Sequence, residues 1–382
     1  MKSLRSKYPG KSMAKATASK KKQTAGTECA VAQANAAQIA EIDRQIALLI
    51  QQRAKVLKAA ASPGVASDCA AGFDDLALSK IVEDTAGPLP KTTVLAVFRE
   101  LMSGCRALVR PLRIACLGPL YSYSHLAAMH RFGRSVEFVP VGTISAVFEE
   151  VNQRHSEFGL VPVENSTDGR IADTLDMFAR LPVRICGQVD MHIHHTLLAK
   201  CSRSEIREVY SKPQAISQCR NWLAKHLPLA RMIEVTSTTM AAQLAAEKLG
   251  AAAIASQQAG VEYGLDILAE NIEDNPHNAT RFAVIGGQIP DRTGNDRTAI
   301  LFQMEHRPGT LADAMNVFKR NKLNLTWIES FPVPGSDRAY MFFAEVETHP
   351  TESRFRRAMA TLERKALRLE VLGAFPVTEA VG

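Results

Sequence analysis

The sequence predicts a multidomain protein with three parts of different fold class. The first 110 residues show helical periodicity without β-like runs, which predicts an all-α part. From residue 113, short β-like runs alternate with helical patterns, which is typical of an α/β fold. After residue 297 the order becomes β-α-β-β-α-β, the ferredoxin-like pattern. A chain of 382 residues is long enough for two or three such domains.

The net charge of +7 is concentrated in the N-terminal tail. Residues 1–30 contain eight basic side chains and one acid, whereas the remainder of the chain carries 38 of each sign. The body therefore gives no electrostatic argument for nucleic-acid binding. We expect the tail to be disordered and solvated; a transit peptide or a polyanion-binding arm stays open.

The cysteines and the hydropathy indicate a soluble protein of the cytoplasm. The seven cysteines are scattered and form no C-x-x-C pair, which favours free thiols over a disulfide or zinc framework. No apolar run approaches the roughly 20 residues that span a bilayer.

Three helices are expected before residue 110. Apolar residues recur at helical spacing over residues 36–61, 76–82 and 93–108, with breaks at Pro63-Gly64 and at 87–90. Three helices bury little by themselves, so we expect them to pack against a second copy of the chain.

The α/β part contains several hydroxyl-rich turns directly after predicted strands. We expect a mostly parallel sheet built from strands at 136–141, 158–163, 183–193, 208–210, 232–235, 251–255 and 282–285. Polar turns follow at 122–124, 164–167, 211–214 and 236–239. One such turn is ordinary helix capping, but four of them indicate a site for a small anion beyond the strand ends.

A polar loop at residues 273–278 leads into the last of these strands. It places the hydroxyl of Thr280 and the guanidinium of Arg281 at a loop-strand junction, where catalytic groups often lie. Taken alone, the segment is better explained as a surface turn whose side chains bond their own backbone.

The C-terminal part has four expected strands and two expected helices. The strands fall at 298–304, 324–330, 339–346 and 371–375, and the helices at 311–321 and 353–364. Residues 286–296 contain glycine and proline breaks and form the linker.

Ordered motifs across the chain resemble one enzyme family. They are Gly118-Pro119, Ser122–His125, Val161–Gly169, Ile193–His195, Val209–Ser211 with Pro213-Gln214 and Gln218, Ala252–Ser256, and Ile272–Asp274 with Asn278 and Thr280–Phe282. Residues 112–375 resemble prephenate dehydratases followed by an ACT regulatory domain. The whole chain resembles the bifunctional chorismate mutase/prephenate dehydratases.

The resemblance implies domains at 31–110 (chorismate mutase-like), 112–290 (dehydratase) and 297–376 (ACT), after the tail at 1–30. It implies a dehydratase part of two lobes, like periplasmic binding proteins, with a cleft between them. The reaction is the decarboxylating dehydration of prephenate to phenylpyruvate in phenylalanine biosynthesis, with no metal or organic cofactor. The implied catalytic residues are Thr280, Asn165, Ser211 and Gln218. The implied substrate-binding residues are Arg281, Phe282, Ser122, Ser124, Glu164, Ser166, Thr167, Gln214, Ser237 and Thr238.

Two of these assignments leave alternatives open. Arg281 is the natural counter-charge for a substrate carboxylate, but an ion pair with Glu164 is nearly as favourable. His194 and His195 lack a third ligand at a recognisable spacing, so a structural role is favoured over a metal site.

The chain departs from the family pattern at several positions. Leu120-Tyr121 stands where the family has Glu-Gly, Lys212 replaces a His, and Gln257 replaces a Glu. Tyr121 adds bulk where a substrate anion would approach the backbone, which concerns substrate affinity more than the type of reaction.

The chorismate mutase site is almost entirely missing. Of the positions that match the family's catalytic residues, only Arg53 retains the family residue; the others fall at Ala36, Gly64, Phe73-Asp74, Cys105 and Val109. One cation cannot orient a dicarboxylate transition state, so we expect no mutase activity and a dimerisation role for these helices.

The C-terminal motifs imply a phenylalanine site at a dimer interface. The implied effector-binding residues are Pro308, Gly309, Thr310, Leu311, Asn324, Glu329 and Ser330. Phe331 replaces a family Arg, so we expect feedback inhibition by phenylalanine in weakened form.

Three functions therefore stay open, with partners limited to small molecules and a second copy of the chain. The leading one is a dehydratase that forms a homodimer or homotetramer. The others are a fully bifunctional enzyme and a non-catalytic amino-acid sensor built on the same two-lobed architecture.

Overall fold

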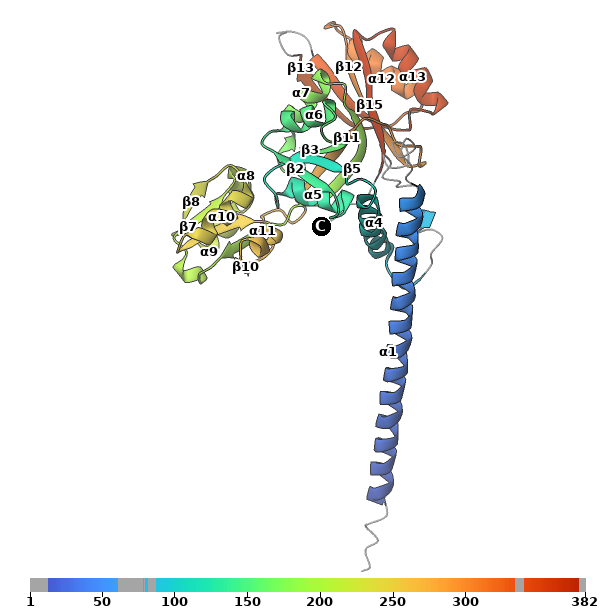
Figure 1. Ribbon diagram of the computed structural model, residues 1–382. Coiled ribbons are helices and arrows are strands. Elements are labelled where there is room, and N and C mark those ends of the chain that lie inside the picture. Colours follow the sequence, from blue (N-terminus) through green and yellow to red (C-terminus); the bar gives the residue numbers. More distant parts are fainter. Residues whose placement is uncertain (1–12, 61–77, 79, 82–86, 334–339, 378–382) are drawn as a thin grey trace, which may run out of the picture. The chain divides into compact units, whose positions relative to one another are not determined.

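The computed structural model describes residues 13–60, 78, 80–81, 87–333 and 340–377 (Figure 1). The chain divides into two compact units, residues 1–62 and 63–382. No helix within the described ranges is long and apolar enough to cross a membrane.

The first unit is the helix α1 (Met13–Ala60). The expectation of a disordered tail over residues 1–30 is wrong from Met13 onward, because this lysine- and alanine-rich segment has high helix propensity and lacks proline. Residues 1–12 lie outside the described residues. From residue 35 on, α1 exposes Ile39, Ile42, Ile46, Leu49 and Val56, each between 47% and 69% exposed.

The second unit begins with α4 (Lys91–Ala107), close to the expected helix at 93–108. The expected helix at 76–82 lies largely outside the described residues; Leu78, Lys80 and Ile81 are helical. α4 packs on α5 (Tyr123–Phe132), where Ser103 Oγ accepts from the backbone N–H of Ser135 at 3.2 Å.

The first lobe is built on a large sheet in the order β13-β14-β12-β15-β5-β11-β3-β1-β2. Its dehydratase-side strands are β1 (Arg113–Leu117), β2 (Glu137–Val141), β3 (Phe158–Asn165), β4 (Gly169–Arg170), β5 (Arg184–His192) and β11 (Ala279–Gly286). α5 covers one face, and α6 (Ile144–Asn152) and α7 (Ala172–Arg180) cover the other. The predicted mostly parallel sheet is wrong: β11 runs antiparallel to both β3 and β5 because the chain enters it from the second lobe.

The second lobe is a five-stranded sheet in the order β10-β6-β9-β7-β8. Its strands are β6 (Thr196–Ala199), β7 (Glu208–Ser211), β8 (Arg231–Glu234), β9 (Ala251–Ala255) and β10 (Asp266–Ala269). Its helices are η1 (Arg203–Glu205), α8 (Pro213–Gln218), α9 (Arg220–His226), α10 (Thr238–Glu247) and α11 (Gln257–Glu262). The chain enters this lobe after β5 and returns through the loop before β11, so Thr280 lies just beyond the crossing.

The C-terminal part has the expected β-α-β-β-α-β order. Its elements are β12 (Asp296–Gln303), α12 (Thr310–Arg320), β13 (Leu325–Pro332), β14 (Tyr340–Glu347), α13 (Ser353–Glu363) and β15 (Arg368–Pro376). α12 and α13 lie together on one face of these strands (Figure 1). The period-two alternation of β12 places Ile300 and Phe302 against these helices, and Ala299 and Leu301 in the core beside α6 and α7.

Within this large sheet, the strands of the C-terminal part and of the first lobe pair at one glycine. β15 pairs in parallel with β5 at a single residue pair, Gly373 opposite Ile185. A Cβ atom at Gly373 would overlap the carbonyl oxygen of Ile185, and the backbone there has a φ of +156°. Only glycine allows this close approach of two backbones.

We expect Gly373→Ala to destabilise the protein by about 1–3 kcal/mol, because the added methyl group must push the two strands apart. The measurement is the midpoint of thermal unfolding. Gly287→Ala is the control, since nothing lies within 4 Å of a Cβ atom at that position. Equal midpoints for Gly373→Ala and wild type would contradict this account.

Candidate functional site

The central contact of the candidate site is a hydrogen bond between β3 and β11. Thr280 stands opposite Asn165 in the antiparallel register. The Nδ2 atom of Asn165 donates to Thr280 Oγ1 at 2.9 Å. The Thr280 hydroxyl is thus an acceptor in this contact, which leaves its own proton available to another group.

The amide of Asn165 is fixed in this orientation by the turn that follows it. Its Oδ1 atom accepts from the backbone N–H groups of Thr167 and Asp168 at 3.0 and 3.1 Å. Asn165 is 4% exposed. With the oxygen committed to the turn, the Nδ2 side must face β11.

Asn278 connects this pair to the second lobe. Its Oδ1 accepts from Asn165 Nδ2 at 3.1 Å and from Thr167 Oγ1 at 3.3 Å. Its Nδ2 donates to Gln218 Oε1 at 3.1 Å. Gln218 Nε2 in turn donates to Asp168 Oδ2 at 3.1 Å, and Gln214 bonds the same carboxylate oxygen. Amides on α8 of the second lobe therefore close onto the turn after β3 of the first.

A buried histidine completes the network. His195 Nε2 lies 2.9 Å from Gln218 Oε1, and its Nδ1 lies 3.0 Å from the hydroxyl of Tyr123. Burial lowers the pKa of His195, so the ring is neutral near pH 7. A neutral ring that donates through Nε2 matches the amide oxygen it faces.

Glu273 anchors the backbone at the point where the chain enters the second lobe. Its carboxylate accepts from the backbone N–H of His195 at 2.8 Å and lies 2.8 Å from His194 Nδ1. Within the described residues, no group of three or more His, Cys, Asp or Glu side chains is arranged to hold a metal ion.

The predicted catalytic residues do not all meet. Asn165, Gln218 and Thr280 belong to the network. Ser211 is fully buried at the end of β7 and donates to the carbonyl oxygen of Ile254 at 2.6 Å. It therefore holds two strands of the second lobe together.

The predicted substrate-binding residues divide in the same way. Thr167 and Gln214 join the network, and Ser166 Oγ accepts from the N–H of Ala279 at 2.9 Å. Ser122 and Ser237 cap the N-termini of α5 and α10, while Ser124 and Thr238 are buried in the first turns of those helices.

Two residues predicted to bind substrate make other contacts in this structure. Phe282 is 2% exposed and packs in the core with α5. Arg281 points away from Thr280 and pairs with Glu164 at 3.1 Å and Glu345 at 2.6 Å. The ion-pair alternative for Arg281 and Glu164 is the one that the structure contains; alternation along β11 places neighbouring side chains on opposite faces.

Tyr121 lies between the two lobes. Its φ of 64° is a backbone conformation that favours glycine. The ring packs against the core of the second lobe, and the carbonyl oxygen accepts from Ser256 Oγ at 3.1 Å.

The residues predicted to bind an effector lie at two places in the C-terminal part. Pro308, Gly309, Thr310 and Leu311 form the start of α12, where Gly309 has a φ of 89°. On β13, Glu329 pairs with Arg170 at 3.2 Å, and Arg170 also bonds the carbonyl oxygen of Ser330. Asn324 donates to Glu347 at 2.8 Å. Phe331 is 7% exposed and packs in the core shared with α6 and α7.

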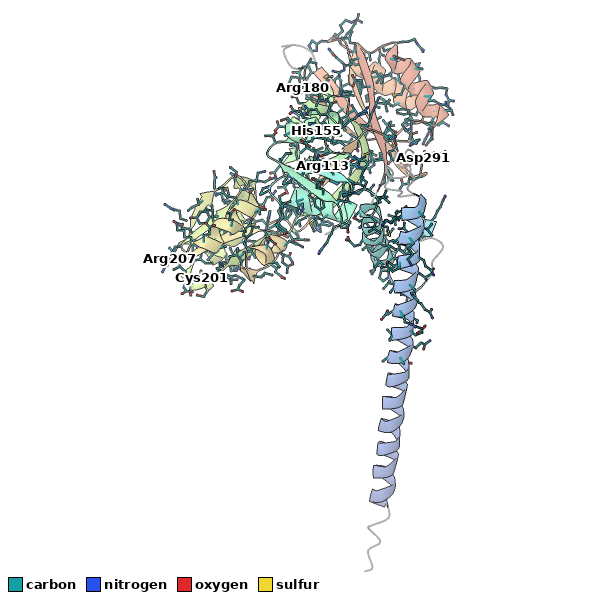
Figure 2. All side chains as sticks on the ribbon, in the orientation of Figure 1. Arg113, His155, Arg180, Cys201, Arg207 and Asp291 are labelled. Carbon is teal, nitrogen blue, oxygen red and sulfur yellow. The ribbon has the colours of Figure 1, made fainter. Side chains whose placement is uncertain are left out.

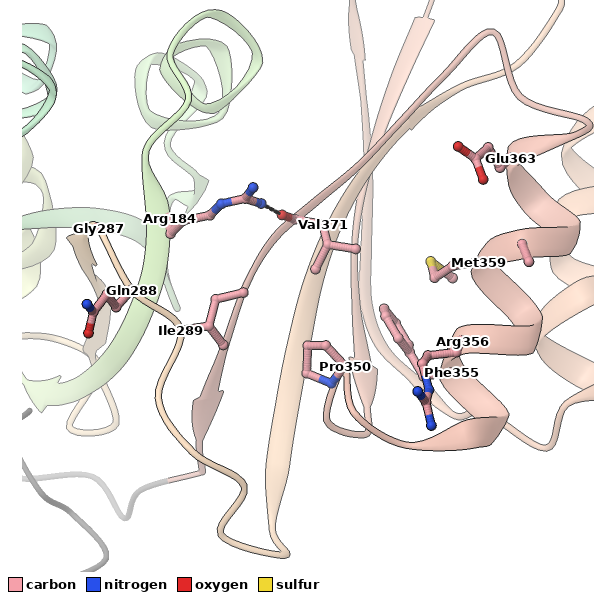
Figure 3. A pocket seen from close by; sticks show the side chains of 11 residues that line it. Arg184, Gly287, Gln288, Ile289, Pro350, Phe355, Arg356, Met359, Glu363 and Val371 are labelled. Carbon is pink, nitrogen blue, oxygen red and sulfur yellow. Dashed lines mark hydrogen bonds between the residues drawn. The ribbon is translucent and has the colours of Figure 1, made fainter.

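A cavity of about 790 Å³ lies away from this network. It is lined by Arg184, by residues 287–289 of the linker and by α13 (Figure 3). None of the residues predicted for substrate or effector binding lines it. The site is therefore defined by its polar side chains and not by this hollow.

The sequence did not assign five members of the network to the site. These are Tyr123, Asp168, His195, Glu273 and Asn278. Asn278 and Glu273 stand in the loop that was singled out, and His195 was assigned a structural role. Their polar contacts depend on how the two lobes meet, which no local pattern encodes (Figure 2 shows all side chains).

Comparison with known proteins identifies the family. The family model for prephenate dehydratase matches residues 114–289. The bifunctional chorismate mutase/prephenate dehydratase of Aquifex aeolicus is 38% identical over 349 residues, covering 89% of this chain and 96% of that protein. The chain therefore belongs to the family of bifunctional chorismate mutase/prephenate dehydratases.

Two solved structures are similar to the larger unit. The prephenate dehydratase of Arthrobacter aurescens, in complex with L-Phe, matches with a TM-score of 0.66 and 30% identity, over 71% of this chain and 92% of that one. GqqA, described as a novel type of quorum quenching acylase, matches with a TM-score of 0.64 and 27% identity, over 70% of this chain and 98% of that one.

Proposed function

We propose that this chain is a prephenate dehydratase that uses Thr280 as the donor to the departing hydroxyl. The observation that carries this proposal is the 2.9 Å hydrogen bond from Asn165 to Thr280 at the junction of the two lobes. The described acylase with a similar fold shows that the fold alone does not select an activity, so the assignment depends on these side chains.

Prephenate carries two carboxylates and a ring hydroxyl. The bond from the ring to its carboxylate breaks and releases CO₂, and the electron pair enters the ring. The C–O bond to the hydroxyl breaks, and the leaving oxygen takes a proton to depart as water. The ring becomes aromatic, so the protein must supply a proton donor and hold the anion in place.

The geometry suits Thr280 for donation. Because its oxygen already accepts from Asn165, its proton is directed toward a further acceptor. Threonine is a poor acid in water, so closure of the lobes by the network of Asn278, Gln218 and Asp168 must exclude solvent and keep the dipoles fixed.

The carboxylates of the substrate would be held by uncharged donors. Arg281 is engaged with Glu164 and Glu345, so the hydroxyl- and amide-bearing turns at the lobe junction are left for this role. Such donors bind an anion without placing another acid beside it.

We assign the C-terminal β-α-β-β-α-β part to the ACT class of regulatory domains, with phenylalanine as effector. The similar Arthrobacter aurescens structure was solved with L-Phe, which supports this assignment. The burial of Phe331 in the core leaves no cation at the position of the family Arg, so binding is proposed to be weakened.

We assign the helical N-terminal part to dimerisation. The exposed apolar residues of α1 recur at spacings of three and four, which is the seam of a helix that packs on another helix. The likeness to biosynthetic enzymes and the free thiols of Cys105, Cys116, Cys186, Cys201 and Cys219 support a location in the cytoplasm.

Thr280→Ala is expected to lower kcat for phenylpyruvate formation from prephenate by about 100-fold or more, because the proton donor is lost. Thr280→Ser keeps the hydroxyl and should retain most activity. Circular dichroism of each variant checks that folding is unchanged. Wild-type kcat in Thr280→Ala would contradict the assignment, and no phenylpyruvate from wild type would favour the non-catalytic sensor.

The chorismate mutase reaction is expected to be absent. Incubation of the purified protein with chorismate, followed by detection of prephenate and phenylpyruvate, tests this. Formation of prephenate at a rate that Arg53→Ala abolishes would establish the bifunctional alternative, which the names of the relatives favour.

Phenylalanine at millimolar concentration is expected to inhibit phenylpyruvate formation or to shift the oligomer in sedimentation velocity. Glycine at the same concentration is the control, since it lacks the apolar ring that a pocket would bury. The effector assignment fails if phenylalanine changes neither quantity.

A further inference from the structure

Arg281 is the chain neighbour of Thr280 and is held by the C-terminal part of the protein. Its guanidinium makes two contacts with the Glu345 carboxylate on β14, at 2.7 and 2.6 Å. The guanidinium carbon lies 4.4 Å from the centre of the Trp327 ring on β13. The Nη1 atom alone contacts both carboxylate oxygens, so the guanidinium is held at one nitrogen by Glu345 and over its face by the Trp327 ring.

Glu345 is a buried acid that depends on this arginine. Its side chain is 4% exposed. Besides Arg281, Arg297 approaches the same carboxylate at 3.9 Å. A buried carboxylate without a close cation is costly, so the pair is held together strongly from both sides.

The other ion-pair partner of Arg281 is Glu164, the chain neighbour of Asn165. Glu164 precedes Asn165 on β3, and the register places Arg281 opposite Glu164 and Thr280 opposite Asn165. The ion pair on one face of the two strands and the Asn165–Thr280 hydrogen bond on the other are therefore one residue apart.

The ladder between these strands is irregular at this point. The register of β11 on β3 shifts between Arg281 and Phe282. The pairing of β11 with β5 stays regular from Ala279 to Val284, so it is the register of β11 on β3 that side-chain contacts help to fix. Besides Glu164 on β3, the contacts of Arg281 come from Glu345 and Trp327 of the C-terminal part.

We propose that Glu345 and Trp327 are positioning residues for the dehydratase reaction. By holding Arg281, they keep β11 in the register that presents Thr280 to Asn165. The C-terminal part thereby completes the catalytic geometry in addition to any role in effector binding. This inference rests on the proposed dehydratase activity.

Glu345→Gln tests the proposal, because it keeps the shape of the side chain and removes its charge. If the Thr280 hydroxyl is displaced because Arg281 is no longer held, kcat is expected to fall roughly tenfold, while KM changes less than about twofold. Glu370→Gln is the matched control: Glu370 pairs with Arg368 on β15 at 2.7 Å and does not contact Arg281. It should leave kcat unchanged.

A double-mutant cycle separates positioning from general loss of stability. If Glu345 acts through the Asn165–Thr280 pair, Glu345→Gln should have almost no further effect on kcat in an Asn165→Ala background. If the kcat loss of the double variant equals the product of the two single losses, the proposal is overturned. Trp327→Leu should repeat the kcat loss, and Trp327→Phe should largely restore activity because an aromatic face remains for the guanidinium.

Hydrogen exchange gives a readout that needs no activity. In Glu345→Gln, amides of residues 279–286 are expected to exchange about tenfold faster, while those of the second lobe stay unchanged. Unchanged exchange in residues 279–286 would overturn the proposal even if wild type is active. If wild type forms no phenylpyruvate, the dehydratase function is refuted, and the exchange result still decides whether Glu345 fixes β11.

Discussion

The hydrogen bond from Asn165 to Thr280 is the contact on which the rest of the site depends. It joins the last residue of β3, which runs outward from the first lobe, to the second residue of β11, which brings the chain back from the second lobe. A single backbone crossing thus places a hydroxyl where both lobes meet. Moving β11 by one residue would turn Thr280 to the opposite face of the sheet.

Buried polar groups surround this contact and link the two lobes. Asn278 accepts a hydrogen bond from Asn165 of the first lobe and donates one to Gln218 of the second. His195 contacts the same oxygen atom of Gln218. In a low-dielectric interior such a chain is strong when every member has a partner and costly when one is missing. Side-chain hydrogen bonds therefore help to determine how the two lobes meet.

The strand pattern and the family motifs were enough to predict most of the elements, the two lobes and five members of the network: Asn165, Thr167, Gln214, Gln218 and Thr280. The short strands β4, β6 and β10 were missed, since a run of two to four residues does not distinguish a strand from a loop or a helix. The helix over residues 13–30 was not predicted, because the density of basic side chains was taken to indicate disorder despite the helix propensity of this segment.

The unexpected contacts at the site have different causes. Strand alternation alone predicts that Arg281 faces away from Thr280. Glu164 was foreseen as a partner of Arg281, but Glu345 and Trp327 were not, because they reach it through the packing of a separate part of the chain. Ser211 was predicted as catalytic from a motif, whereas its contact with Ile254 depends on the pairing of β7 with β9.

The most direct test of the account is whether Asn165 acts through Thr280. The measurement is kcat for phenylpyruvate formation in Asn165→Ala, Thr280→Ala and the double variant. The account predicts that the double variant is hardly slower than Thr280→Ala, because removing the hydroxyl also removes what Asn165 orients. A double variant whose loss equals the product of the two single losses would contradict it.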